Sequence, residues 1–285
     1  MGILDKFKIG YWNIGIIEHP ISDIMEHKPF MIKWLKHRYK DRFFADPFIY
    51  KEDERYYYIL AEELIFTEDK GTIVLLKIDR NTMKLVQRQM IINDKYHLSY
   101  PNYNNKTIIP ENHKSGNLYA FHFDGDKVEK ELISNIPLID PTFVQYQEKL
   151  WLFGTTKESF DDPNKKLSIF YKKGGCFVPH KRNPVKIDIN SARPGGNFFW
   201  YQGELFRPAQ NCEHLYGEDI RIMKVKQLDE ENYIEELHTI ISSHDSERYN
   251  EGLHTFNVYN GFIVVDGFEH SIQIRQKIRN KFVKL

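Results

Sequence analysis

The chain has 285 residues, of which 41% are hydrophobic, so it can bury a substantial core in one large all-β domain or two smaller ones. Its 40 Lys and Arg residues balance its 40 Asp and Glu residues, and this zero net charge argues against a protein that binds nucleic acid or an anionic membrane through its overall field. The two cysteines, Cys176 and Cys212, are too few and too far apart for a disulfide scaffold or a metal-ligand motif.

The first predicted element is a strand over residues 8–17, KIGYWNIGII. Lysines precede this apolar stretch, as they do in a signal peptide, but Asn13 and Gly15 interrupt it and no small-residue cleavage site follows. No segment reaches the roughly 18 apolar residues that a membrane helix requires. We therefore expect a cytoplasmic protein with no integral membrane segment. The apolar spacing in residues 20–41 predicts a short helix or an irregular arm.

The rest of the chain repeats one outline five times: a polar residue, an apolar strand, a polar turn, a second apolar strand and a second polar residue. The five segments are ADPFIYKEDERYYYILAEE from Ala45, LSYPNYNNKTIIPE from Leu98, IDPTFVQYQEKLWLFGTT from Ile139, ARPGGNFFWYQGELFRPAQ from Ala192 and LHTFNVYNGFIVVDG from Leu253. Each segment predicts a β-hairpin, and a short turn brings the outer ends of its two strands together.

Further alternating segments between the hairpins, such as GTIVLLKIDR and DIRIMKVKQL, supply a third and a fourth strand to each unit. Five such units, spaced roughly 40 to 60 residues apart, indicate an all-β, five-bladed β-propeller formed as a single domain. The strand over residues 8–17 is then expected to close the ring against the last blade. A β-sandwich with coincidental spacing is the alternative.

In a propeller the inner strands converge on the axis, so the polar residues at the strand ends are expected to surround one mouth of the axial channel. The residues predicted to form this ring are Asp46, Glu62, Glu63, His97, Tyr100, Glu111, Asp140, Thr155, Arg193, Arg207, Gln210, His254 and Asp266. Ordinary turn chemistry would place Asp, Asn, Gly and Pro at these edges, without the Arg, His and Glu seen here. The ring is therefore a candidate site, although any one of its members can equally be a turn acid or part of a strand-end ion pair.

The motifs HLSYP, IPE, LIDPTFV, LWLFGT, ARPGGNFF, RPAQNCEHLYGEDIRI and GLHTFN occur along most of the chain, from about Trp12 to Asp266. Together they resemble the propeller domain of plant glucosamine inositolphosphorylceramide transferases and of bacterial proteins from surface-polysaccharide loci. That domain is itself similar to the five-bladed, family 43-like glycoside hydrolases. The resemblance implies a carbohydrate-active protein of surface-glycan biosynthesis or processing.

In those hydrolases an Asp that opens blade one is the general base, an Asp that opens blade three tunes it, and a Glu that opens blade four is the general acid. The resemblance places Asp46 of ADPF at the base and Asp140 of IDPTF at the tuning acid. Blade four departs from the pattern, because Arg193 of ARPGG stands where the acid would be. Either another carboxylate, Glu111 or Glu62, supplies the proton, or the scaffold does not hydrolyse glycosides.

Two arginines in the ring, Arg193 and Arg207, favour an anionic substrate group, since guanidinium presents a fixed fork of donors to carboxylate or phosphate. We expect Asp46, Asp140 and Glu111 to be catalytic and the other ring residues to bind a carbohydrate or sugar nucleotide, with no cofactor and no metal. An internal ion pair between Arg193 and Asp140 is the structural alternative. A noncatalytic propeller that assists a partner transferase, and a protein-interaction propeller, are the alternative functions.

Overall fold

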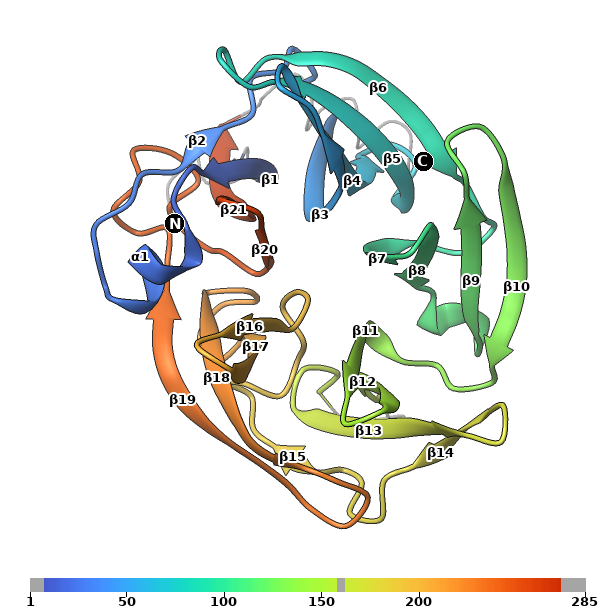
Figure 1. The fold of residues 1–285 in the computed structure, drawn as a ribbon. Helices are drawn as coiled ribbons and strands as arrows, with labels where there is room; N and C mark the ends of the chain where they lie inside the picture. Colours follow the sequence, from blue (N-terminus) through green and yellow to red (C-terminus); the bar gives the residue numbers. More distant parts are fainter. Residues whose placement is uncertain (1–7, 158–161, 273–285) are drawn as a thin grey trace.

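The structure, a computed structural model, describes residues 8–157 and 162–272 and is a five-bladed β-propeller (Figure 1). Each blade is an antiparallel sheet of four strands, and the third blade has one additional short strand. The five sheets are separate and lie around a common axis, whereas a sandwich would pack two sheets face to face. The predicted all-β class and the five blades are confirmed.

The strands run outward from the axis in chain order in the first four blades. Blade 1 consists of β3 (Arg42–Glu52), β4 (Tyr56–Ile65), β5 (Lys70–Asp79) and β6 (Leu85–Ile92). Blade 2 consists of β7 (Ser99–Asn104), β8 (Thr107–Glu111), β9 (Leu118–Phe123) and β10 (Val128–Ser134), with a short 3-10 helix, η2 (His113–Ser115), after β8. Blade 3 consists of β11 (Ile139–Tyr146), β12 (Lys149–Thr155), β13 (Lys166–Lys173), β14 (Cys176–Pro179) and β15 (Lys186–Ile187). Blade 4 consists of β16 (Phe199–Tyr201), β17 (Glu204–Asn211), β18 (Asp219–Leu228) and β19 (Tyr233–Ile241).

Blade 5 combines the two ends of the described chain. Its inner strands are β20 (Phe256–Tyr259) and β21 (Phe262–Ile272), and its outer strands are β1 (Lys8–Ile17) and β2 (Lys33–Trp34). β1 pairs antiparallel with β21 in an unbroken register from Lys8 opposite Ile272 to Ile17 opposite Ile263. The hydrogen bonds of this ladder join the two ends of the described chain within blade 5 and so close the ring.

The segment between β1 and β3 forms an arm over blade 5. It contains a single helical turn, α1 (Ile21–Met25), and then β2, which pairs with β1 at Gly15 and Ile16 and is the outermost strand of the blade. A strand of two residues is too short to leave an alternating pattern in the sequence, which is why this contribution to the sheet was not predicted. Within the described ranges, no helix is both long and apolar enough to span a membrane.

Apolar side chains fill the spaces between neighbouring blades, and each of the five interfaces has its own buried cluster. The interface of blades 5 and 1 is typical: Ile14 and Val264 of blade 5 pack with Phe44 and Ile59 of blade 1. The smallest cluster joins blades 2 and 3 and has three buried members, Leu118, Leu138 and Leu152. The apolar core therefore lies between the blades and not at the axis. The polar residues at the axis are supported by the backbone of the inner strands around them.

Candidate functional site at the axial mouth

The start of the inner strand has the same unusual backbone in three blades. Asp46, Tyr100 and Asp140 have φ of 50°, 45° and 49°, and each precedes a proline. The strand pairing slips at the same point, with register shifts between residues 45 and 48, 99 and 102, and 139 and 142. Such β-bulges redirect a side chain, and a left-handed residue other than glycine costs on the order of 1–3 kcal/mol. A left-handed residue followed by proline therefore marks the point where the inner strands of blades 1, 2 and 3 bend near the axis.

Blade 4 reaches the axis differently. The sequence predicts an inner strand that begins near Arg193, but β16 begins at Phe199, and before it only an isolated bridge joins Pro194 to Ala209. Proline has no N–H to give the ladder, and the glycines that follow come very close to blade 5. A Cβ on Gly196, whose φ is 142°, would lie 2.0 Å from the carbonyl oxygen of Phe256. The ARPGG segment therefore packs backbone against backbone and leaves the Arg193 side chain free to enter the cluster.

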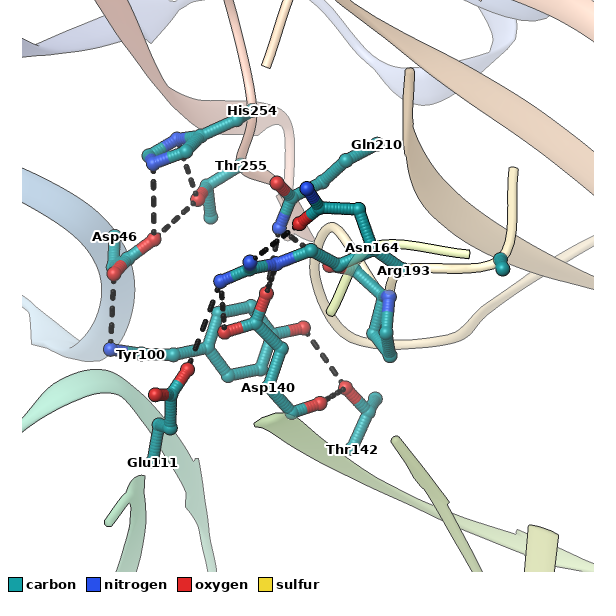
Figure 2. Close-up of polar contacts among 12 residues, drawn as sticks. Asp46, Tyr100, Glu111, Asp140, Thr142, Asn164, Arg193, Gln210, His254 and Thr255 are labelled. Atoms are coloured by element: carbon teal, nitrogen blue, oxygen red, sulfur yellow. Dashed lines mark hydrogen bonds and ion pairs between the residues drawn. The ribbon is translucent and has the colours of Figure 1, made fainter. Parts of the chain in front are cut away.

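Figure 2 shows that Asp46, Glu111, Asp140, Arg193 and His254, which come from all five blades, converge at the axis. Asp140 and Arg193 form the closest pair: Nε of Arg193 donates to Oδ2 of Asp140 at 2.6 Å, and Nη2 donates to Oδ1 at 3.3 Å. Nη2 also lies 3.6 Å from a carboxylate oxygen of Glu111. One guanidinium is therefore shared between two carboxyl groups.

A second cluster links blades 5 and 1 through an Asp, a His and another Asp. Nδ1 of His254 lies 2.6 Å from Oδ2 of Asp266, and its Nε2 lies 3.6 Å from Oδ1 of Asp46. Asp266 also accepts backbone N–H groups from Asp46, His254 and Thr255. The Thr255 hydroxyl donates to Asp46 at 3.0 Å, and the backbone N–H of Tyr100 donates to the other oxygen of Asp46. The Asp46 carboxyl of blade 1 is therefore held by groups from blades 5 and 2.

The burial of these groups separates their pKa values. Burial raises the pKa of Asp46 to about 6, although the charge of His254 opposes this shift. Burial likewise raises the pKa of Asp140 well above its usual range, against the opposing charge of Arg193. Burial alone would raise the pKa of Glu111 too, but a hydrogen bond from His113 and the charge of Arg193 lower it to about 2.

At neutral pH, Glu111 is therefore ionised, whereas burial displaces the pKa of Asp140 upward despite the bidentate contact with Arg193. The pKa of Asp46, about 6, lies close to neutrality, as suits a group that exchanges a proton. The sequence places the general acid at Glu111, but a carboxyl with a pKa of about 2 carries almost no proton to donate. Burial shifts the pKa of Asp140 in the direction that favours a proton donor.

An aromatic wall covers one side of the cluster. The Trp12 ring stacks on His254, with a centroid separation of 3.8 Å and an interplanar angle of 12°. The Tyr216 ring meets His254 edge to face at 5.3 Å, and the Arg193 guanidinium lies 5.0 Å from its centroid. Tyr216 is 42% exposed, whereas Arg193 is 9% exposed and Asp140 1%. Tyr216 therefore stands between solvent and the buried charges.

Burial would lower the pKa of His254, but the charges of Asp266 and Asp46 raise it to about 9. The imidazolium is thus the resident cation of the second cluster. Asp46, His254 and Asp266 also offer three ligand atoms within 4.8 Å of one another, a set that suits a divalent cation. Such an ion would have to displace the proton that His254 holds between the two carboxylates.

The other predicted ring residues lie at different distances from this centre. Glu62 pairs with His97 at 3.2 Å beside the mouth, and this hydrogen bond raises the pKa of His97 although burial lowers it. Gln210 is at the centre, where its amide nitrogen donates to Asp140 at 2.7 Å. Tyr100 is fully buried, and its hydroxyl is held by Thr142 and by the backbone N–H of Gly196. Tyr100 therefore supports the site from beneath.

Arg207 is the exception, because the structure does not bring it to the mouth. Its guanidinium is fully buried between a bidentate contact with Glu235 and the carbonyl oxygens of Ser191 and Ala192. Along a strand, residues three apart face opposite sides, so Arg207 points into the blade interface while Gln210 faces the axis. Its expected role in binding substrate is replaced by a structural one.

Several residues of the cluster were not predicted. Trp12 comes from β1 and Tyr216 from the turn between β17 and β18, and neither belongs to the hairpin repeat. Asn164 accepts a hydrogen bond from Nη1 of Arg193 at 2.8 Å. Thr255 could have been predicted from the sequence, since it directly follows His254 at the start of the fifth repeat.

Comparisons with known proteins identify relatives of this chain. A family profile described as glucosamine inositolphosphorylceramide transferase 1, N-terminal, matches residues 32–262. The chain is 33% identical over 213 residues to glucosamine inositolphosphorylceramide transferase 1 of Arabidopsis thaliana, and 29% identical over 211 residues to the protein of the same name from Oryza sativa subsp. japonica. These matches cover 68% and 69% of this chain but 27% and 28% of the two relatives, so the chain spans about a quarter of their length.

Solved structures were also compared. Zg3597, a family 117 glycoside hydrolase produced by Zobellia galactanivorans, has a TM-score of 0.47 at 12% identity, covering 84% of this chain and 89% of that one. An alpha-L-arabinofuranosidase from Lactobacillus brevis also has a TM-score of 0.47, at 15% identity, covering 75% of this chain and 78% of that one. The family assignment comes from the sequence matches. This chain belongs to the family of the N-terminal region of glucosamine inositolphosphorylceramide transferase 1.

Proposed function

We propose that the chain is a carbohydrate-active propeller that binds an anionic sugar or sugar nucleotide at the axial mouth and acts on its glycosyl bond. The observation that carries the proposal is the buried group of Asp46, Asp140, Glu111 and Arg193, in which carboxyl groups of very different pKa surround one guanidinium. A single fold that separates carboxyl pKa values in this way can provide both a proton acceptor and a proton donor.

In the proposed reaction, the hydroxyl of water or of an acceptor attacks the anomeric carbon while the bond to the leaving oxygen breaks. Asp46 takes the proton of the attacking hydroxyl, and Asp140 gives its proton to the leaving oxygen when that oxygen needs one. A phosphate leaving group needs no proton, and Arg193 would then stabilise its charge. Substrate reaches Arg193 only if the Tyr216 side chain moves aside, because the residues beneath it are nearly inaccessible to solvent.

Unpaired polar atoms at the ends of the second strands support a sugar as the ligand. Asn112 follows β8, Thr155 ends β12 and Gln210 lies near the end of β17. Each is buried and has a side-chain polar atom without a hydrogen-bond partner among the described residues. Sugar hydroxyls both donate and accept, and so would satisfy such atoms. The relatives are named for glucosamine, and we propose an amino sugar as the first substrate class to test.

The second candidate is a noncatalytic propeller that holds the same ligand for a partner transferase. Two points favour it: the chain matches only about a quarter of its named relatives, and the resemblance to five-bladed glycoside hydrolases implies that Arg193 stands where those enzymes carry the acid. In this case the carboxyl groups orient the ligand, and the bond is broken elsewhere.

The decisive experiment measures both binding and turnover with sugar nucleotides that carry glucosamine or N-acetylglucosamine. If the chain is an enzyme, Asp46→Asn abolishes turnover and retains binding, whereas a binding module returns the ligand unaltered from the wild-type protein. Arg193→Met should weaken binding by about 2–5 kcal/mol, because it removes the guanidinium that would pair with the anionic group of the ligand. Arg55→Met is the matched control, since the Arg55 side chain is 72% exposed on a turn. Equal affinities of the Arg193 variant and the wild type would refute the proposed site.

A further inference from the structure

A second concave site lies outside the axial mouth, on blade 5. It is a cleft of about 980 Å³ between two segments, residues 28–40 of the arm and residues 242–249 of the loop that follows β19. Its size is at the upper end of the range for small-molecule sites. Aromatic rings contribute much of its lining: Tyr11, Trp12, Trp34, Tyr39 and Tyr249.

The floor of this cleft is rigid. Trp34 lies directly on the bare backbone of β1 and β21: a Cβ on Gly15 or on Gly267 would come within 2.7 or 2.3 Å of the indole. The indole nitrogen donates to the Ser246 hydroxyl at 2.8 Å and so ties the arm to the opposite loop. The Trp34 and Tyr249 rings lie 5.0 Å apart. The cleft is therefore formed in advance of any ligand, which lowers the entropic cost of binding.

The arm contributes positive charge that the protein does not neutralise. Lys36 and Lys40 are exposed on the cleft wall, and among the described residues neither of their ammonium groups takes part in an ion pair. Arg248 is different, because it pairs with Glu269 and stacks on the Tyr249 ring at 4.7 Å. Two acids, Asp245 and Glu247, lie on the loop side of the cleft. The arm thus forms a cationic wall of the cleft, whereas the loop side carries the two acids together with Arg248.

The lowered pKa of His37 reflects both its burial and the positive charges near the cationic wall. Its ring lies in the cleft lining, and Nδ1 is buried without a hydrogen-bond partner among the described residues. Burial, together with the charges of Lys40, Arg248 and Arg42, lowers the pKa of His37 to about 4. A neutral imidazole with an unused nitrogen beside unpaired lysines is suited to a negatively charged partner.

We propose that this cleft is a second binding site, for a sugar that bears a phosphate group, with the sugar ring against the aromatic floor and the phosphate beside Lys36 and Lys40. Aromatic faces and a phosphate-binding cation are the two elements that such a ligand needs. Trp12 lines the cleft and also stacks on His254 at the mouth, so the two sites share one wall. The proposal does not depend on any reaction at the mouth.

The test titrates the full chain with glucose 6-phosphate, and in parallel with glucose and with inorganic phosphate, while the imidazole signals are followed by NMR. His37→Asn assigns the His37 signal. We expect glucose 6-phosphate to shift this signal, to raise the pKa of His37 and to bind more tightly than either half of the molecule. The double variant Lys36→Gln, Lys40→Gln should weaken binding about tenfold. Lys172→Gln, Lys173→Gln makes the same charge change on exposed residues of β13 and should leave binding unchanged.

An unchanged His37 signal at ligand concentrations up to about 10 mM would overturn the proposal, since this range detects dissociation constants near 1 mM. Equal affinity for inorganic phosphate and glucose 6-phosphate would overturn the carbohydrate assignment. The experiment distinguishes a failure of the proposed binding at the cleft from a failure of the proposed binding at the axial mouth. Arg193→Met acts at the mouth alone, so the His37 shift should persist in that variant whether or not the mouth binds a sugar nucleotide.

Discussion

Replacing Asp266 by Asn should destabilise the propeller at the junction of blades 5 and 1. The Asp266 carboxylate is fully buried and accepts three backbone N–H groups at 2.9 to 3.1 Å, from Asp46, His254 and Thr255, in addition to its 2.6 Å contact with His254 Nδ1. Asparagine has nearly the same shape, but one of its two terminal groups is a donor that would face other donors. It also leaves the His254 imidazolium without its nearest counter-charge.

The expected loss in the free energy of unfolding is about 3–5 kcal/mol, the range for removing one partner of a buried ion pair. Hydrogen bonds to a charged group contribute about 1.5–3 kcal/mol each, so the loss of two of them gives a similar figure. Urea denaturation followed by tryptophan fluorescence measures it. Asp124→Asn is the control: Asp124 is exposed and accepts two backbone N–H groups through one oxygen, which asparagine retains. Losses of equal size in the two variants would refute the reasoning.

Two further outcomes follow from the same clusters. The pKa of His254 is raised in the folded protein from 6.5 to about 9, so protonated His254 contributes about 3 kcal/mol to the free energy of unfolding. This contribution is fully present below about pH 6.5 and is lost as the pH rises to about 9. Urea midpoints measured across this interval should fall in the wild type and fall much less in Asp266→Asn; a flat wild-type profile contradicts the assignment. Tyr100→Phe should cost about 1–3 kcal/mol in the same assay, because it leaves the buried N–H of Gly196 without its acceptor, whereas the Thr142 hydroxyl still donates to the Asp140 carbonyl oxygen. A neutral outcome would mean that another group or a water replaces the phenol.

Much of the fold was predictable from the sequence because the hairpin repeat is a local property. A polar residue before the first strand and a second after the last one recur in all five units, and equivalent positions of a radial repeat meet at the axis. This reasoning applies to Asp46, Asp140 and His254 without any knowledge of long-range contacts. It also predicts their neighbours on the second strands, such as Glu111.

The features of the site that were not predicted depend on which face of its strand a side chain occupies and on which residues surround it in the folded protein. Arg207 and Gln210 cannot both face the axis, and the period of two along a strand was sufficient to show this. The roles of the carboxyl groups were not readable, because the low pKa of Glu111 requires His113 and Arg193 at specific positions. Tyr216 reaches the mouth from a turn outside the repeat, so the hairpin repeat does not identify it, although it lies within the motif RPAQNCEHLYGEDIRI.

The pairing of β1 with β21 also determines how the protein responds to mechanical force. Lys8 and Ile272 are register partners at one end of that ladder, and Ile17 and Ile263 are partners at the other. A pull that separates residues 8 and 272 would load the hydrogen bonds one after another, as in opening a zipper, instead of shearing all of them together. Tension applied through the two ends of the described chain would therefore peel blade 5 apart first, before the inner strands of the other four blades bear any load.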